Sequence, residues 1–173
     1  MDFSLFLKIF KKTLDKCTFL VYNKCVPKRY TINERRKQVR VTQESDYAIR
    51  MCCALDEAGE VLDTGELSER VAISKSIALK VLRKLRTAGI VNSHKGAEGG
   101  YELAVDPLKL SLLDIIEAIE GKIYISKCLD DCHFCSLNGY NKTCCKVHNA
   151  FLLLNEDLTK KLTAITVRSI TTK

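Results

Sequence analysis

The hydrophobic positions of this chain follow a helical period over much of the sequence that comes after residue 40. Apolar residues first recur at spacings of three and four over 42–58, which predicts a helix that ends at Gly59. A second, short helix is expected to open at Asp63 or Thr64, and a third to be capped by Ser74. The residues expected to face the core are Ala48, Met51, Cys52 and Leu55, then Leu67 and Val71, then Ile77, Ala78, Val81, Leu82 and Leu85.

Two short alternating segments flank a glycine-rich turn after the third helix. Ile90-Val91 and Tyr101-Glu-Leu103 are typical of strands, and residues 96–100 supply the turn. We expect Gly99 and Gly100 to allow positive φ and a close approach to a DNA backbone. Two helices followed by such a ribbon predict a winged helix-turn-helix, a mainly α fold with a small β wing. A small helical bundle with a charged outer face is the alternative.

The last third of the sequence predicts two more helices. Ser111 caps the first, which carries Leu112, Ile115, Ile116 and Ile119 on its apolar face and ends at Gly121. A long helix is expected from about Thr143 to Ile170. Its apolar stripe consists of Val147, Phe151, Leu154, Leu158, Leu162 and Ile165, close to a heptad pattern. A second copy of the chain is the simplest cover for such a stripe, so we predict a homodimer.

The positive charge of the chain is concentrated near its start. Residues 1–38 carry ten Lys or Arg and three Asp or Glu, whereas residues 39–173 carry eighteen of each sign. The first 38 residues also lack a sustained period, so we interpret them as a misassigned start, with a real basic tail, disordered or lying against the domain, as the alternative. The expected division is an N-terminal extension (1–38), a DNA-binding domain (39–121), a cysteine-rich loop (122–146) and a dimerisation helix with its tail (147–173).

Basic side chains also gather on the third helix and the wing. Between Ser74 and Gly100 there are six Lys or Arg residues against one acid, Glu98. The six are Lys75, Lys80, Arg83, Lys84, Arg86 and Lys95. A local excess of this kind is the footprint that phosphate binding requires, so double-stranded DNA is the expected partner. Lys95, at the wing turn, is expected to reach phosphates or a narrow minor groove.

Soft metal ligands cluster between Cys128 and His148. Five of the nine cysteines and two of the three histidines lie in this segment. The candidate ligands are Cys128, Cys132, Cys135, Cys144, Cys145 and His148. Thiolates bind iron and zinc strongly, and spacing alone leaves an iron–sulfur cluster and zinc about equally favoured. Metal-free thiols that switch by oxidation are the third alternative.

Other classes of function find little support. No apolar run is long enough to cross a membrane, and we expect a cytoplasmic, reducing setting, where clustered cysteines favour metal or redox chemistry. A thiol oxidoreductase using Cys132-x-x-Cys135 would need a βαβ context that is not visible. No substrate-binding motif is evident either. We therefore predict a protein that is not an enzyme and has no small-molecule substrate.

Several motifs together resemble the Rrf2 family of winged-helix transcription regulators, over about residues 39–168. They are Val41-Thr42, Asp46-Tyr47-Ala48, Ile73-Ser74, Leu82-x-x-Leu85, Ala88-Gly89-Ile90-Val91 and Gly96-x-x-Gly99-Gly100-Tyr101-x-Leu103. The resemblance implies a dimer crossed by long C-terminal helices and bound to a palindromic operator. In many members an iron–sulfur cluster in the loop before that helix controls DNA affinity.

The resemblance also assigns roles to individual positions. Ser74, Ser76 and Lys80 would face DNA, and Lys95 stands where many members place a minor-groove Arg. Ile77 replaces a Tyr and Leu79 an acidic residue of the iron–sulfur regulator's pattern, which leaves the operator sequence open. The cysteine spacing departs from the even spacing of better-known members. The implied ligands are Cys128, Cys135 and Cys145, with Cys132, Cys144 or His148 as the fourth. Four thiolates would suit a 4Fe–4S cluster and three thiolates plus His148 a 2Fe–2S cluster, and the family context favours either over zinc.

Overall fold

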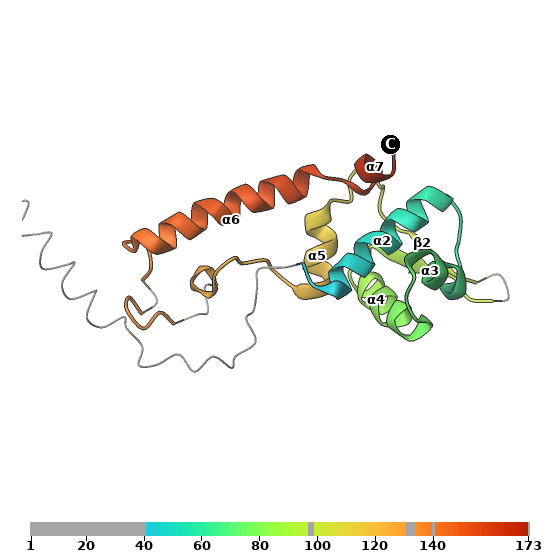
Figure 1. Ribbon diagram of the computed structural model, residues 1–173, viewed down its shortest axis with the longest axis horizontal. Helices are drawn as coiled ribbons and strands as arrows, with labels where there is room; N and C mark the ends of the chain where they lie inside the picture. The colour runs from blue at the N-terminus through green and yellow to red at the C-terminus, as the bar shows by residue number, and fades with distance from the viewer. Residues whose placement is uncertain (1–40, 97–98, 131–133, 140, 173) are drawn as a thin grey trace, which may run out of the picture. The chain divides into compact units, whose positions relative to one another are not determined.

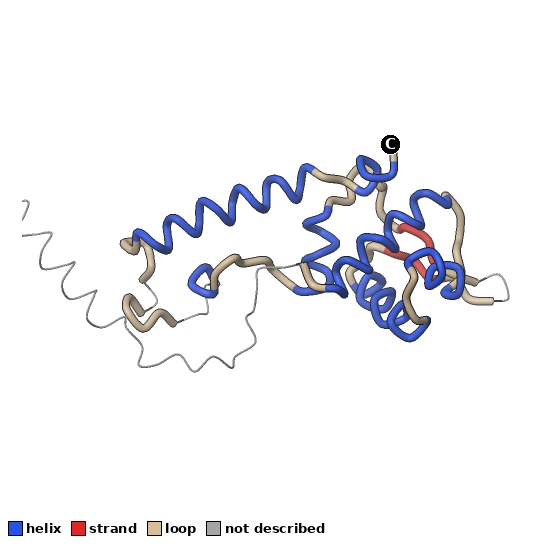
Figure 2. The backbone as a smooth tube through the Cα atoms, viewed as in Figure 1, coloured by secondary structure: helices blue, strands red, loops and turns tan. Residues whose placement is uncertain are grey.

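A computed structural model describes residues 41–96, 99–130, 134–139 and 141–172. The predicted N-terminal extension lies outside the described residues, as do Cys132 and His133. The described part is mainly helical with a small two-stranded antiparallel sheet, as predicted (Figure 1; Figure 2). In chain order the elements are α2 (Gln43–Ala58), α3 (Thr64–Val71), α4 (Lys75–Thr87), β1 (Val91–Ser93), β2 (Tyr101–Leu103), α5 (Leu112–Glu120), the 3-10 helix η1 (Lys127–Leu129), α6 (Lys146–Ala164) and α7 (Val167–Thr171).

The helix α2 lies at the centre of the winged-helix part and contacts α3, α4, α5 and α7. It begins because the hydroxyl of Thr42 accepts the N–H of Ser45, and it ends at Gly59, whose φ is 66°. Its predicted inner face is confirmed, since Ala48, Met51 and Cys52 are fully buried. Burial raises the pKa of the Cys52 thiol, which is therefore a protonated, small hydrophobic residue of the core.

The helices α3 and α4 form the predicted helix-turn-helix. Asp63 caps α3, and Ser74 caps α4 through the N–H of Ile77. Between the helices, Ala72 adopts the left-handed conformation with φ of 58°, which turns the chain sharply enough for α4 to pack across α3. The inner face of α4 contains Ala78, Val81, Leu82 and Leu85, all fully buried.

The prediction that Ile77 belongs to this inner face is wrong, because its side chain is 40% exposed. The buried residues centre the inner face on Ala78 and Leu85, which leaves Ile77 at its margin. There it lines a hollow of about 550 Å³ between α2, α4 and α5, together with Tyr47 and Ile119. The apolar period correctly predicted a buried face on this helix, but it did not show how far the neighbouring helices cover α4.

The strands β1 and β2 pair antiparallel and form the predicted wing, with Asn92 opposite Glu102. Tyr101 also forms an isolated bridge with Leu62, through hydrogen bonds of 2.8 and 3.0 Å. The expectation of positive φ at Gly99 and Gly100 is wrong, since in this turn Gly96 has the positive φ, 122°. A side chain at Gly100 would overlap the carbonyl of Leu62. Close packing within the protein therefore accounts for Gly100.

The predicted long C-terminal helix is two helices. α6 ends at Ala164, and the extended residues Ile165 and Thr166 follow before α7. The chain breaks here because the carbonyl of Ile165 accepts the N–H of Leu112 at the start of α5, while Thr166 caps α7. α7 returns to the core, where Val167 is fully buried. No helix within the described ranges is both long and apolar enough to span a bilayer.

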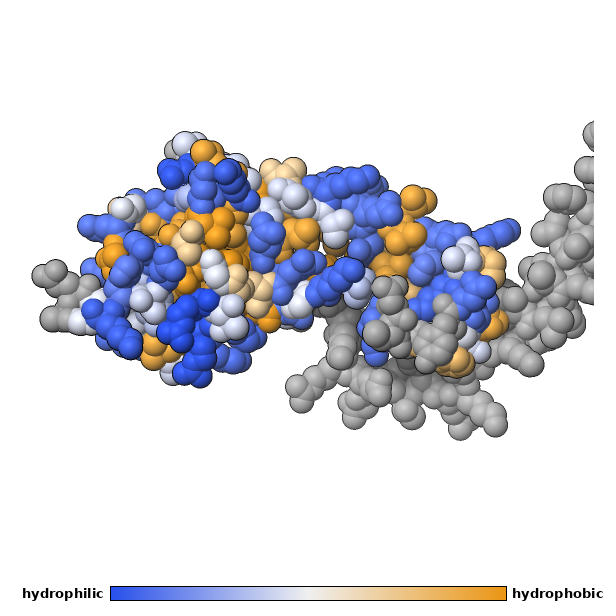
Figure 3. Space-filling view, turned by 180° about the vertical axis from the view of Figure 1, so that it is seen from behind, coloured by the Kyte–Doolittle hydropathy of each residue, from blue (hydrophilic) through white to orange (hydrophobic). Residues whose placement is uncertain are grey.

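The apolar stripe of α6 is partly covered by its own chain. α6 contacts α5 and η1, and Asn155 exchanges hydrogen bonds with the backbone of Ile123 and Ile125. Phe151, Leu158 and Leu162 are half-buried, whereas Val147, Leu154 and Ile165 remain 62%, 57% and 40% exposed. Hydrophobic side chains also interrupt the hydrophilic surface on the face seen in Figure 3. Part of the predicted stripe is therefore free to contact another molecule.

Candidate DNA-binding interface and cysteine-rich segment

The outer face of α4 combines small polar, basic and apolar side chains. Ser76, Lys80 and Arg83 are exposed on it, and the hydroxyls of Ser74 and Ser76 lie 3.0 Å apart. Leu79 is 44% exposed on the same face. Basic side chains can bind phosphates, hydroxyls can bind phosphates or bases, and a leucine can contact the methyl group of thymine.

Not all basic residues of α4 point freely outward. The side chain of Lys75 lies over the first turn of α3, beside Gly65. Arg86 donates to the hydroxyl of Ser93, 3.3 Å away, and thereby ties α4 to β1. Lys75 and Arg86 of the predicted basic stripe are thus exposed but also make contacts within the fold.

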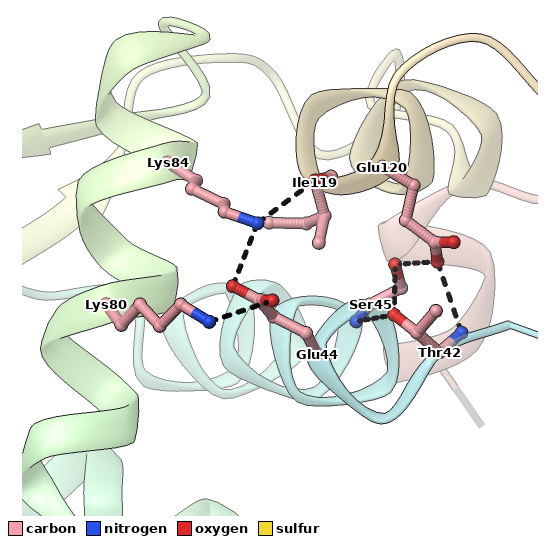
Figure 4. Close-up of polar contacts among 7 residues, drawn as sticks. All are labelled: Thr42, Glu44, Ser45, Lys80, Lys84, Ile119 and Glu120. Atoms are coloured by element: carbon pink, nitrogen blue, oxygen red, sulfur yellow. Dashed lines mark hydrogen bonds and ion pairs between the residues drawn. The ribbon is translucent and has the colours of Figure 1, made fainter.

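The carboxylate of Glu44, which was not among the predicted site residues, joins α2 to α4. The amine of Lys80 lies 3.3 Å from Oε2 of Glu44, and that of Lys84 lies 3.0 Å from Oε1 (Figure 4). Burial alone raises the pKa of Glu44, but the hydrogen bonds and charges of Lys84 and Lys80 outweigh it, so the pKa lies below its ordinary value. Glu44 is therefore ionised at neutral pH. An acid in the first turn of a helix is common, so the local pattern of residues does not predict this role.

The end of α5 joins the same cluster. The amine of Lys84 also donates to the carbonyl of Ile119, 3.2 Å away. One carboxylate oxygen of Glu120 accepts the N–H of Thr42 at 3.1 Å and the hydroxyl of Ser45 (Figure 4). α2, α4 and α5 thus meet in one polar cluster beside the exposed face of α4.

The wing carries Lys95 next to Gly96 at its turn, and Lys95 is exposed. On the two strands, His94 Nε2 lies 2.9 Å from the carboxylate of Glu102. The hydrogen bond from His94 holds the pKa of Glu102 below its ordinary value. The acid of β2 is therefore engaged with His94, and Lys95 carries an exposed positive charge at the turn.

The cysteine-rich segment extends from η1 to the start of α6. Cys128 lies on η1 and its sulfur accepts the hydroxyl of Ser126 at 3.3 Å, whereas Cys145 is the residue before α6. Cys144 is exposed. In the part of the chain that is described, no three Cys, His, Asp or Glu side chains converge on a point that could hold a metal ion. Cys132, one predicted ligand, lies outside that part.

Two local features nevertheless suit metal ligands. Cys135 and Gly139 close a tight turn through reciprocal backbone hydrogen bonds of 2.9 and 2.7 Å. Within this turn the backbone N–H groups of Asn138 and Leu137 lower the pKa of the Cys135 thiol, which favours the thiolate. Nδ1 of His148 is buried and has no hydrogen-bond partner among the described residues. By its chemistry, this donor set fits an iron–sulfur cluster or zinc.

A helix-turn-helix with a basic outer face, followed by a two-stranded wing, defines the winged-helix class of DNA-binding domains. Residues 41–173 match the model of the Rrf2 family, described as an iron-dependent transcriptional regulator. The chain belongs to the Rrf2 family. The resemblance to this family that the sequence motifs indicated is thereby confirmed.

Individual relatives agree with this assignment. The chain is 30% identical over 133 residues to the transcriptional regulator IscR of Vibrio cholerae, covering 75% of this chain and 73% of that one. It is also 34% identical over 87 residues to Rv1287 of Mycobacterium tuberculosis, named as an HTH-type transcriptional regulator, over 49% of this chain. That match spans only 54% of the relative's length. The family and these relatives are transcriptional regulators and not enzymes, as predicted.

Solved structures show the same fold at low sequence identity. CymR, the global cysteine regulator of B. subtilis, is 19% identical with a TM-score of 0.63, over 78% of this chain and 97% of that one. IscR of T. potens is 21% identical with a TM-score of 0.58, over 77% of this chain and 86% of that one. These likenesses confirm the winged-helix fold.

Proposed function

We propose that this chain binds double-stranded DNA in the cytoplasm as a transcriptional regulator, with the outer face of α4 in the major groove. The observation that carries the proposal is the exposed face formed by Ser76, Lys80 and Arg83 on a helix that the fold presents outward. Lys95 lies on the wing, after β1, and would contact a flanking phosphate or the minor groove.

The regulator would act as a homodimer on a palindromic operator. Val147 and Leu154 are exposed apolar residues of α6, and Ile165 directly after its end is exposed too, so a second α6 would cover this stripe. A two-fold axis between the subunits would place the two α4 helices on half-sites about one DNA turn, roughly 34 Å, apart. The operator would then repeat one half-site with inverted orientation.

The cysteine-rich segment would sense the signal through an iron–sulfur cluster. Cys128, Cys135 and Cys145 would hold it, with Cys132, Cys144 or His148 as the fourth ligand. Support comes from the thiolate-stabilising turn at Cys135, from the buried Nδ1 of His148, which finds no hydrogen-bond partner in the described part of the chain, and from the iron-dependent description of the family. Such a cluster, when bound, supplies redox and iron-responsive chemistry. Structural zinc and metal-free thiol oxidation are the alternatives.

Two experiments test these proposals. The first is selection of bound duplexes from a random-sequence pool, which should yield an inverted repeat. Recovery of no enriched sequence, together with no binding at low salt, would disprove DNA recognition. The second is anaerobic purification followed by absorption spectroscopy and by iron, sulfide and zinc analysis.

The metal analysis separates the three forms of the sensing proposal. A brown protein with matching iron and sulfide would support the cluster, and the iron content per chain would give its type. Stoichiometric zinc in a colourless protein would make the segment structural. For a cluster, the affinity of holo and apo protein for the selected duplex should differ by about 5- to 150-fold, the usual size of allosteric coupling. Equal affinities would rule out sensing.

A further inference from the structure

Two lysines of α4 share one carboxylate, that of Glu44. Lys80, with a side chain 66% exposed, contacts Oε2, whereas Lys84, with a side chain 37% exposed, contacts Oε1. The two lysines are four residues apart on the helix, so they lie on one side of it, facing the first turn of α2 (Figure 4). The side chain of Glu44 is 24% exposed.

The two contacts differ in how firmly they are held. Lys84 also donates to the carbonyl of Ile119 at the end of α5, so its amine has a second contact besides the ion pair with Glu44. The amine of Lys80 contacts Glu44 and no other polar group in the described part of the chain. Lys80 also lies on the exposed face that is proposed to meet DNA. Lys80 is therefore the partner that can leave.

We propose that Glu44 competes with DNA phosphate for Lys80 and thereby sets the DNA affinity of this protein. This inference rests on the proposed function. In the free protein Glu44 holds the amine of Lys80 against α2. On binding, Lys80 moves from the carboxylate to a phosphate, and Glu44 keeps Lys84 as its partner.

Two features make this exchange inexpensive. Lys84 balances the charge of Glu44 both before and after Lys80 moves to a phosphate, so the partly buried carboxylate is never left without a cation. The hollow of about 550 Å³ beside Lys80 and Ile77 leaves the lysine room to move without displacing packed side chains. An ion pair with a largely exposed lysine is weak, and a phosphate in a polyanion competes with it effectively.

The test compares Glu44→Gln with Asp46→Asn, which removes the same charge from the same helix. Asp46 pairs with Arg50 of the same helix at 3.0 Å, and both side chains are exposed. The probe is a short mixed-sequence duplex at low salt, because phosphate contacts do not depend on sequence. Glu44→Gln is expected to tighten binding about two- to fivefold more than Asp46→Asn does. Both variants are first compared with the wild type in thermal unfolding, to show that they fold.

A second pair of variants identifies the mediator. In a Lys80→Ala background, Glu44→Gln should tighten binding no more than Asp46→Asn does, because the amine for which Glu44 and phosphate compete is gone. Equal tightening by Glu44→Gln and Asp46→Asn would reduce the effect to general electrostatics and overturn the proposal. A greater tightening by Glu44→Gln than by Asp46→Asn that persists with Lys80→Ala would overturn it too, as would weaker binding by Glu44→Gln. If the wild type binds no duplex at all, the proposed function fails instead.

Discussion

The guanidinium of Arg168 lies 2.9 Å from the carboxylate of Asp56, whose side chain is only 2% exposed. The hydroxyl of Thr171 donates to the other carboxylate oxygen at 2.5 Å. Arg168 and Thr171 both come from α7, whereas Asp56 belongs to α2. The helix α7 therefore supplies a positive charge and a hydroxyl donor to the carboxylate of Asp56, which is buried near the end of α2. Arg168 and Asp56 are 112 positions apart in the sequence.

Replacing Arg168 should destabilise the fold. Arg168→Ala leaves the carboxylate of Asp56 buried with only its hydroxyl donor, so we expect a loss of about 1–3 kcal/mol in the free energy of unfolding, measured by urea denaturation. Arg50→Ala is the matched control, because the Arg50–Asp46 pair is exposed and should be worth less than about 1 kcal/mol. Equal effects of the two changes would contradict the role given to Arg168.

Gly100→Ala separates the structural from the DNA-contact explanation of the wing glycine. A methyl group there would overlap the carbonyl of Leu62, so the strand pairing around Tyr101 must shift. We expect a loss of about 1–3 kcal/mol in stability, as for other overpacked sites. Unchanged stability with weakened DNA binding would instead restore the original expectation that Gly100 allows a close approach to DNA.

Lys95→Ala should weaken DNA binding without affecting the fold. If Lys95 neutralises one phosphate, the slope of log affinity against log salt should fall by about one unit. Affinities measured at several salt concentrations give this slope. Lys160→Ala removes the same charge from an exposed position on α6 and serves as the control. Equal slopes for the wild type and Lys95→Ala would place the wing away from the phosphates.

The turn between α3 and α4 can be tested at Ala72. Its left-handed conformation (φ 58°, ψ 48°) is unfavourable for a residue with a Cβ atom and more so for a β-branched one. Ala72→Val should therefore lower the free energy of unfolding by about 1–2 kcal/mol. Ala72→Gly should have little net effect, because relief of strain offsets the greater freedom of the unfolded chain. A harmless valine would show that the turn adopts another conformation.

Leu154→Glu should abolish the proposed dimer. The side chain is 57% exposed in a single chain, so the change should leave that chain folded while placing a charge in the apolar contact. Molecular mass by sedimentation equilibrium is the measurement, and Glu156→Gln, an exposed change two residues away, is the control. A wild type that is monomeric at high concentration would contradict the dimer itself.

Local signals in the sequence were sufficient for most of the fold. Thr42, Asp63, Ser74 and Ser111 cap the helices that their positions predicted, because a cap depends on hydrogen bonds within one turn. The wing was predictable from two alternating segments around a glycine-rich turn for the same reason.

Features that depend on distant partners were not predictable. The helix breaks after Ala164 because the N–H of Leu112 donates to the carbonyl of Ile165. No residue pattern near position 165 predicts this contact. The two lysine partners of Glu44 come from another helix. The exposure of Ile77 depends on where α5 lies relative to α4. Which thiols form the ligand set stays a prediction, because it depends on the path of the loop around Cys132.

The burial of Val167 makes the winged-helix core discontinuous along the chain. Residues from α2 to α5 and residues of α7 share one hydrophobic interior, with the cysteine-rich segment and α6 inserted between them. A fragment that stopped at Gly121 would leave the site of Val167 open to water. A protease that cut once within the cysteine-rich segment would instead leave two pieces that still hold each other, in the manner of complementing fragments.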